Sequence, residues 1–421
     1  MANNVWVAKQ KKTAQVNTIT PAAVTVGNTF SVTINLKSVT FTATGTTVAG
    51  VVTGLVALLE ASEEPEFAEI TWTDSTTCVT ATADDPGKPF TQTSSSATGS
   101  GSAGHSNVTA TTTANTSPSD VNDALNWSAG TTPATGEDVY IDGTIQTPLL
   151  WNLGSLSAQT LATLNISLNA PQIGLPELDE DGTAYTQYRG VYFAIGATIC
   201  NIGTGGDGNG LQMCKLNFGS VQTTTTVFNT GSPSESNRQA VTLKGTHASN
   251  LLIQQAGSVG IAVLGGELST FVTIHLGQVG GGSQPTLVLG PGLTNTTINQ
   301  NNGSLLLQSA ITTLNHKGAS SEIRGAGAIT TINQSAGSIV HKGTGTITTY
   351  NLTGGQVDFG DAGPAITVSA CKLFGNCQWY DKGYRVAYTA GLALQGGARL
   401  VGTDGGSVLI DLGPGRVWTP S

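Results

Sequence analysis

Charged residues are scarce in this sequence. Lys, Arg, Asp and Glu together make up 10% of the 421 residues, whereas soluble domains usually carry about 25%. The formal net charge is −9, and the only dense basic cluster is Lys9, Lys11 and Lys12. Because no basic stripe is available to neutralise phosphates, nucleic acid is not an expected partner. We interpret residues 1–19 as an N-terminal arm, either solvated or docked on an acidic neighbouring subunit.

Long apolar segments are missing as well. No apolar stretch reaches the roughly 18 residues that span a membrane, so we expect no membrane partner. The first six residues lack the charged start and the apolar core of a signal peptide. The sequence therefore predicts a protein that is made and assembled in the cytoplasm.

Cysteine is rare, and its spacing is irregular. The cysteines are Cys78, Cys200, Cys214, Cys371 and Cys377. They match no zinc-binding spacing, and an odd number of thiols cannot pair completely. We expect isolated buried thiols, although Cys371 and Cys377 could form a bridge on oxidation.

Motifs for catalysis are also lacking. The histidines are scattered, and the sequence contains no nucleophile elbow, phosphate-binding loop or dinucleotide fingerprint. The acids of the later repeat region, Glu322, Asp358 and Asp361, stand singly, whereas glycoside cleavage uses two paired carboxylates. The sequence thus predicts a protein that is not an enzyme and has no catalytic residues.

One acidic stretch could form a metal site. Glu177, Asp179 and Asp181 alternate just before Gly182, so their carboxylates could converge on one calcium ion. No bidentate Glu follows at the spacing of an EF-hand loop. A solvated acidic loop is the favoured interpretation, and no cofactor is expected.

The sequence is rich in residues that form strands and tight turns. Glycine occurs 55 times, and Thr, Val, Ile and Asn recur along the chain. This composition suits closely stacked strands joined by short turns. The predicted fold class is mainly β, with a small N-terminal α+β domain in the order β-β-α-β-β followed by a parallel β-helix, or solenoid.

Residues 20–95 are predicted to form the small α+β domain. Apolar and polar residues alternate in two runs within 30–43, which is typical of half-buried strands. From 48 to 59 the apolar residues fall at helical spacing. Residues 70–83 have the pattern of a hairpin. These elements indicate one amphipathic helix packed on an antiparallel sheet.

The remaining boundaries follow from composition. Residues 96–118 consist almost entirely of Thr, Ser, Ala, Gly and Asn, which bury too little apolar surface to fold alone, so they are predicted to be a linker. Residues 119–164 form a capping segment that leads into the solenoid. The solenoid itself is predicted to cover residues 165–411, and residues 412–421 form a C-terminal tail.

A short repeat carries the solenoid prediction. Thr-Thr-Ile-Asn at 296–299 recurs as Thr-Thr-Leu-Asn at 312–315, Thr-Thr-Ile-Asn at 330–333 and Thr-Thr-Tyr-Asn at 348–351. A second feature keeps pace at Gly303-Ser304-Leu305, Ser321-Glu322-Ile323, Gly337-Ser338-Ile339 and Gly355-Gln356-Val357. Repetition of strand formers and glycine at so short a period indicates stacked coils.

Stacked coils place equivalent residues in columns at the strand spacing of about 4.8 Å. One predicted column is an inward ladder of Ile298, Leu314, Ile332 and Tyr350. The other is a turn ladder of Asn299, Asn315, Asn333 and Asn351. Stacked asparagines can satisfy one another's amides from coil to coil.

Aromatic residues gather after the last clear repeat. Trp379, Tyr380 and Tyr384 form a candidate surface for recognising a host glycan. Such residues more often fill a core or cap the end of a solenoid. The sequence leaves both roles open.

Six segments between residues 65 and 267 carry a resemblance to a known group of proteins. They are PEFAEITW at 65–72, DPGKPFTQTSS at 85–95, GTTPATGEDVYI at 130–141, GSVQTTTTVFNTGSP at 219–233, LKGTHASN at 243–250 and GSVGIAVLGGE at 257–267. These segments resemble a poorly characterised family of structural proteins from bacteriophage and prophage virions. The resemblance spans much of residues 20–270, implies a virion component and brings no catalytic residues.

The predicted function is that of a non-catalytic virion structural protein. It would be an accessory surface component, either a head decoration or a fibre-like appendage, anchored by its N-terminal region. The expected partners are other virion proteins and further copies of the chain in a homotrimer. The alternatives are a tail fibre or adhesin that binds a host glycan and, more remotely, a tailspike that degrades polysaccharide.

Overall fold

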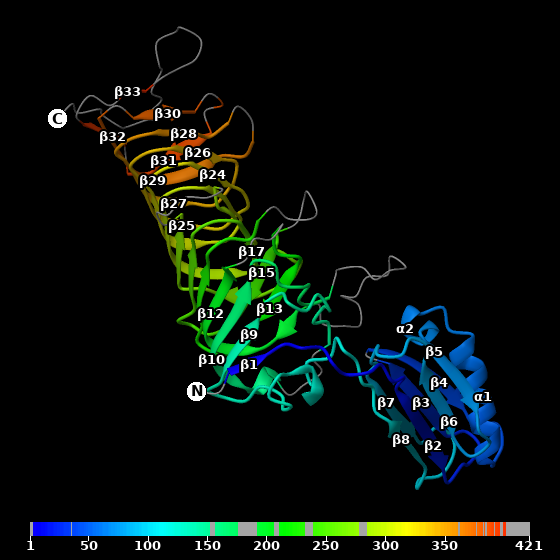
Figure 1. Ribbon diagram of the computed structural model, residues 1–421. Coiled ribbons are helices and arrows are strands. Elements are labelled where there is room, and N and C mark those ends of the chain that lie inside the picture. Colours follow the sequence, from blue (N-terminus) through cyan, green and yellow to red (C-terminus); the bar gives the residue numbers. More distant parts are fainter. Residues whose placement is uncertain are drawn as a thin grey trace.

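The computed structural model describes residues 3–34, 36–151, 156–175, 192–205, 210–231, 239–277, 284–360, 363–375, 377–381, 383, 385–390, 392–395 and 399–400. Within these residues the chain forms a small N-terminal domain and an elongated body of two long parallel sheets (Figure 1). The prediction of a mainly β protein is confirmed.

The N-terminal domain combines two antiparallel sheets with a helix. Its elements are β2 (Val16–Ala22), β3 (Thr29–Ile34), β4 (Lys37–Thr42), α1 (Val48–Glu60), α2 (Pro65–Ala68), β5 (Ile70–Asp74), β6 (Val79–Ala83), β7 (Gln92–Ala97) and β8 (Ser106–Thr113). One sheet has the strand order β5-β6-β2-β8, and the other has the order β4-β3-β7. The predicted order β-β-α-β-β therefore matches β3 to β6 and leaves out three strands.

Helix α1 forms where the helical spacing predicts it. The hydroxyl oxygen of Thr47 accepts a hydrogen bond from the Gly50 amide at 3.2 Å and so caps the first turn. Leu55 is fully buried on the face that packs against the sheets. At Gly54 an added Cβ would lie 2.1 Å from a ring carbon of Phe41 in β4. The glycine thus lets the helix approach the sheet closely.

The prediction that residues 96–118 form a linker is corrected by the structure. Strand β8 lies within it and pairs antiparallel with β2, while β7 pairs with β3. Most side chains of β8 are exposed, so an alternation of apolar and polar residues cannot mark it in the sequence. Ladder hydrogen bonds and the strand preference of threonine hold this polar edge strand in place.

The body consists of two parallel sheets. Along most of the chain, consecutive strands belong in turn to one sheet and then to the other. Sheet 1 contains β1 (Asn3–Val5), β9 (Asp138–Ile141), β10 (Thr160–Ser167), β12 (Gly196–Thr204), β14 (Thr224–Val227), β16 (Leu251–Gln254), β18 (Ser269–Thr270), β19 (Thr273–Leu276), β21 (Leu293–Gln300), β23 (Ile311–His316), β25 (Ile329–Gln334), β27 (Ile347–Leu352), β29 (Ile366–Phe374), β31 (Val386–Tyr388) and β32 (Leu392–Gln395). Sheet 2 contains β11 (Phe193–Ala194), β13 (Cys214–Asn217), β15 (Val241–Lys244), β17 (Ser258–Ile261), β20 (Thr286–Leu289), β22 (Ser304–Leu307), β24 (Ser320–Ile323), β26 (Ser338–His341), β28 (Gln356–Asp358), β30 (Gln378–Tyr380) and β33 (Arg399–Leu400). Between the two sheets runs one continuous apolar core.

The N-terminal residues do not form a free arm, which corrects the interpretation of residues 1–19. Strand β1 pairs with β9 at the first edge of sheet 1. The Trp6 side chain is 2% exposed, and its ring centroid lies 5.1 Å from that of Trp127 in an edge-to-face contact. Pairing and burial together cover an edge that would otherwise offer unpaired backbone groups.

The predicted capping segment, residues 119–164, already contains two strands of sheet 1. Besides β9 and β10 it holds two short 3-10 turns, η1 (Ala124–Asn126) and η2 (Leu156–Ala158). The sheets therefore begin before residue 165. The predicted end of the solenoid at 411 and the predicted tail, residues 412–421, lie outside the described residues.

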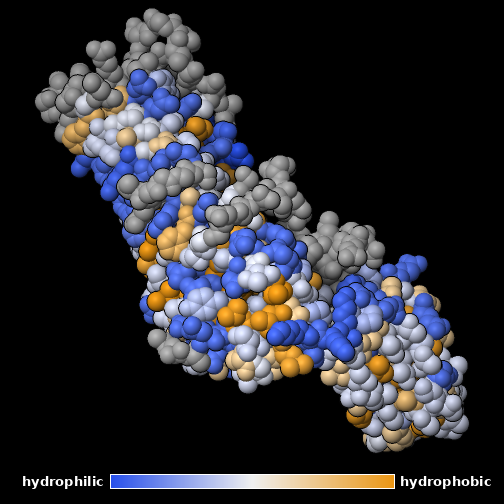
Figure 2. Space-filling model, in the orientation of Figure 1, coloured by the Kyte–Doolittle hydropathy of each residue, from blue (hydrophilic) through white to orange (hydrophobic). Residues whose placement is uncertain are grey.

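The described surface carries both hydrophilic and hydrophobic residues (Figure 2). Figure 2 shows hydrophilic residues predominating on the visible face toward the far end of the body, with hydrophobic residues scattered nearer the N-terminal domain. No helix in the described ranges is long and apolar enough to cross a membrane.

Candidate functional site

The four asparagines of the repeat lie in one column across β21, β23, β25 and β27. Neighbouring asparagines are paired in the strand register. The Nδ2 atom of each donates to the Oδ1 atom of the one before: Asn315 to Asn299 at 2.8 Å, Asn333 to Asn315 at 2.9 Å and Asn351 to Asn333 at 2.9 Å. The result is a directional chain of amide hydrogen bonds that links successive coils.

The apolar residues of the repeat lie in a second column that faces the core. Ile298, Leu314, Ile332 and Tyr350 are in register and fully buried. The column continues beyond the repeat to Ile274 on one side and Cys371 on the other. The Tyr350 hydroxyl donates to Gln334 Oε1 at 2.5 Å, which satisfies the only polar atom that the side chain brings inside.

The second repeated feature is offset in one coil. The register pairs Leu305 with Ser321 and Ser321 with Ile339, so the equivalent segment there is 319–321 and not 321–323. Ala319 has a φ of +67°, close to the +87° of Gly303 at the equivalent position. In this coil Ala319 replaces the glycine of the pattern and Ser321 replaces the apolar residue. The match of residues 321–323 to the pattern, made on residue type, was therefore wrong.

Buried glutamines close the turns of several coils, and sequence reasoning missed them. Gln254, Gln300 and Gln334 are each at most 1% exposed. In each case Nε2 donates to the carbonyl of the glycine three residues later and to a carbonyl of the second sheet 2 strand that follows in the chain, at 2.8 to 3.2 Å. The recurring pattern Gln-x-x-Gly was the signal in the sequence.

A buried histidine extends this polar system. His316 Nδ1 lies 2.8 Å from Gln300 Oε1, and the Ser321 hydroxyl donates to the same oxygen at 2.5 Å. Because Gln300 Oε1 can only accept, His316 Nδ1 carries a proton. Burial lowers the pKa of His316 to about 4.

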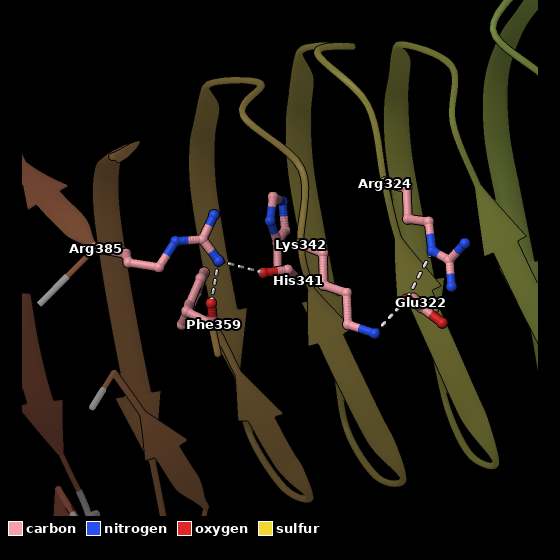
Figure 3. A network of polar contacts seen from close by, with 6 residues as sticks. All are labelled: Glu322, Arg324, His341, Lys342, Phe359 and Arg385. Atoms are coloured by element: carbon pink, nitrogen blue, oxygen red, sulfur yellow. Dashed lines mark hydrogen bonds and ion pairs between the residues drawn. The ribbon is translucent and has the colours of Figure 1, made fainter. Parts of the chain in front are cut away.

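Arg385 is another buried group that sequence reasoning did not identify. Its side chain lies against turns of successive coils (Figure 3), and the residue is 4% exposed. The guanidinium donates to the carbonyl oxygens of Phe359, His341 and Pro364, the last at 3.1 Å. Burial, followed by the charge of Arg385, lowers the pKa of His341 to about 4. Arg385 thus ties three stretches of backbone together.

Two of the three acids named in the repeat region, Glu322 and Asp358, have structural partners. Glu322 forms ion pairs with Arg324 Nε at 2.7 Å and Lys342 Nζ at 2.7 Å (Figure 3). Hydrogen bonds from these two side chains lower the pKa of Glu322, whereas a general acid needs a raised pKa. Asp358 Oδ1 accepts the Gly360 amide at 2.7 Å. Asp361 lies outside the described residues.

The prediction that Trp379 belongs to a glycan-recognition surface is corrected, because the side chain is buried. This side chain is 3% exposed and packs on Phe359, with ring centroids 4.6 Å apart. Trp379 is in register with Val357, an inward position of the repeat, so strand alternation turns it into the core. Tyr380 is half-buried, and its hydroxyl donates to Gln378 Oε1 at 2.8 Å. Tyr384 lies outside the described residues.

The metal and cysteine predictions have different outcomes. Glu177, Asp179 and Asp181 lie outside the described residues. In the part of the chain that the structure describes, no group of three His, Cys, Asp or Glu residues could hold a metal ion. All five cysteines are free thiols, and Cys371 and Cys377 are both buried. Burial raises the pKa of both thiols.

Replacing one asparagine of the column tests its contribution to stability. In Asn333→Leu the Asn315 Oδ1 atom loses its donor and the Asn351 Nδ2 atom loses its acceptor. We expect the free energy of unfolding to fall by about 1–2 kcal/mol, measured by urea titration followed by circular dichroism. Thr331→Val on the same strand is the matched control and should change it by less than about 0.5 kcal/mol. Equal effects of the two changes would show that the column adds nothing specific.

The residues brought together so far link coil to coil through amide, histidine and guanidinium groups. Comparison of the chain with protein-family models, with curated proteins and with solved structures gives no match.

Proposed function

We propose that the body of this protein is a parallel β-solenoid. The support is that successive strands from β19 to β31 alternate between sheet 1 and sheet 2, that the strand pairs in these two sheets are parallel, and that equivalent residues of the repeat are in register. Closing each coil by short turns stacks one coil on the next with nearly every strand paired on both sides. Only the two ends of such a rod present unpaired strands.

We further propose that the protein is a structural component of a phage particle, an accessory decoration or a fibre-like appendage. The observation that carries this proposal is the run of contacts from strand to strand through the apolar column, the asparagine column and the buried glutamines. Such a rod resists unfolding and proteolysis because most backbone groups are bonded to the next coil. In this proposal the rod assembles as a homotrimer and the N-terminal domain contacts other particle proteins.

Mass spectrometry of purified particles tests this role. Intact particles from a host that carries the gene are expected to contain the protein in many copies after density-gradient purification and a high-salt wash. Particles from an otherwise identical strain with the gene deleted provide the control for contamination by lysate proteins. If the protein stays in the soluble lysate and is missing from washed particles, the proposal is wrong.

A further inference from the structure

A polar groove opens in the N-terminal domain beside β7 and β8, away from the columns of the body. Its volume is about 920 Å³, which is within the range of about 300–1,000 Å³ that is common for ligand sites. Residues of β7, β8, the start of β2 and the segment 114–122 line it. Amide and hydroxyl side chains form most of this lining, and Asp120 is its only charged residue.

A connected set of amides holds one wall of the groove. Gln15 Nε2 donates to the Phe90 carbonyl at 3.0 Å, and Gln15 Oε1 accepts the Phe90 amide at 3.2 Å. Gln15 also donates to Asn17 Oδ1 at 3.3 Å, and Asn17 Nδ2 donates to Gln92 Oε1 at 3.2 Å. Because each side chain is fixed by its neighbour, the wall presents its polar atoms in a preset arrangement.

Four buried polar atoms in this lining have no hydrogen-bond partner: Asn107 Oδ1, Gln92 Nε2 and the two amide atoms of Asn115. Asn107 is 8% exposed, and its Nδ2 atom donates to the carbonyls of Ser31 and Ser95 while its Oδ1 atom has no donor. Gln92 Nε2 has no acceptor. An unsatisfied buried polar atom costs about 1–3 kcal/mol. The lining therefore holds two acceptors and two donors without partners, and a ligand that satisfies them would stabilise a complex.

We propose that this groove is a binding site for a neutral saccharide. Sugar hydroxyls both donate and accept, so neighbouring hydroxyls satisfy Asn107 Oδ1 and Gln92 Nε2 together. An anionic ligand would meet the carboxylate of Asp120, and a cation would find no second carboxylate in the lining. An apolar ligand would leave these polar atoms buried and unsatisfied. The inference does not depend on a role in a phage particle.

An extended peptide fits the groove less well. A peptide strand would have to pair with the free backbone edges of β7 and β8. Side chains already bridge these edges, because the Ser94 hydroxyl donates to the Asn107 carbonyl at 2.9 Å and Asn107 Nδ2 donates to the Ser95 carbonyl at 3.2 Å. The edge carbonyls that a peptide needs are thus occupied where the two strands come together.

The test uses the full chain on an array of immobilised neutral, uronic-acid and sulfated oligosaccharides. The strongest neutral oligosaccharide is then titrated by calorimetry. We expect saturable binding to neutral members of the array. Binding to none of them, or to acidic members alone, would overturn the proposal. A threonine- and valine-rich decapeptide serves as a second probe, and binding of this peptide without any neutral saccharide would assign the groove to peptides instead.

A matched pair of variants locates the site. Thr111 is exposed and lines the groove, so Thr111→Trp should obstruct it and weaken binding at least tenfold. Ala110 is an exposed neighbour on β8 outside the lining, so Ala110→Trp should keep the affinity within twofold. Thermal unfolding midpoints of both variants report that the domain is folded. Equal affinities in the two folded variants would place binding elsewhere and refute the assignment.

Discussion

Ile332→Asp is expected to abolish the soluble folded protein. Ile332 is fully buried in β25, between Leu314 of one neighbouring strand and Tyr350 of the other. An aspartate there would place a carboxylate among apolar side chains with no partner. The cost is about 4 kcal/mol or more, a large part of the stability of an ordinary protein. Soluble yield after expression and the urea midpoint of any soluble fraction measure the effect.

Thr330→Ser is the control for Ile332→Asp, since Thr330 lies on the same strand and is exposed. It should leave yield and urea midpoint almost unchanged. If the apolar column forms the core of a solenoid, substitutions at these two residues, which are only two positions apart, should differ greatly in their effect on yield and stability. If Ile332→Asp folds as well as Thr330→Ser does, the apolar column does not hold the coils together.

Acidification from pH 7 to about 4.5 is expected to destabilise the protein. Burial lowers the pKa of His316 and of His341 from 6.5 to about 4. The unfolded state binds protons more readily, so the stability from neutral burial is complete above pH 6.5 and falls as the pH approaches 4. Complete loss would amount to about 3 kcal/mol for each histidine. Urea titrations between pH 7.5 and 4.5 measure it.

Single variants assign this pH dependence to the two rings. His316→Gln copies Gln300 and Gln334, which occupy the equivalent positions on the adjacent strands. His341→Leu follows Ile323, its neighbour in register. Each variant should show a shallower fall in the urea midpoint below pH 6.5 than the native chain, because one proton-binding group is gone. Unchanged slopes in both would show that other groups cause the acid sensitivity.

Much of the body could be predicted because the repeat is local in sequence. Neighbouring strands of sheet 1 pair equivalent residues that are 16 or 18 positions apart, so a repeat of that length places Asn315, Asn333 and Asn351 in one column. Alternation of side chains along strands then separates the inward from the outward position. The same rule, applied to residues 378–380, would have turned Trp379 inward, since Gln378 and Tyr380 flank it on the outer face.

The buried polar side chains that bind backbone carbonyls in the body could not be predicted in the same way. Arg385 reaches carbonyls more than twenty residues away, and no spacing rule marks a guanidinium that binds backbone. The offset at Ala319 is similar, because an alanine with positive φ carries no glycine signal. Gln300 and Gln334 did carry a signal, the glycine three residues later, but its meaning depends on the turn they close.

Sequence alone determined that this protein is mainly β, has a helix over 48–59 and builds a stacked apolar column, since each depends on the local period of apolar residues. Only the tertiary structure decided that β1 covers the first edge of sheet 1, that β8 belongs to the N-terminal domain and that a polar groove lies beside it. These features depend on pairing between residues far apart in the chain, such as Asn4 with Val139 and Thr18 with Ala110. Such pairing is set by backbone hydrogen bonds, which every residue except proline offers alike, so composition and period leave it undetermined.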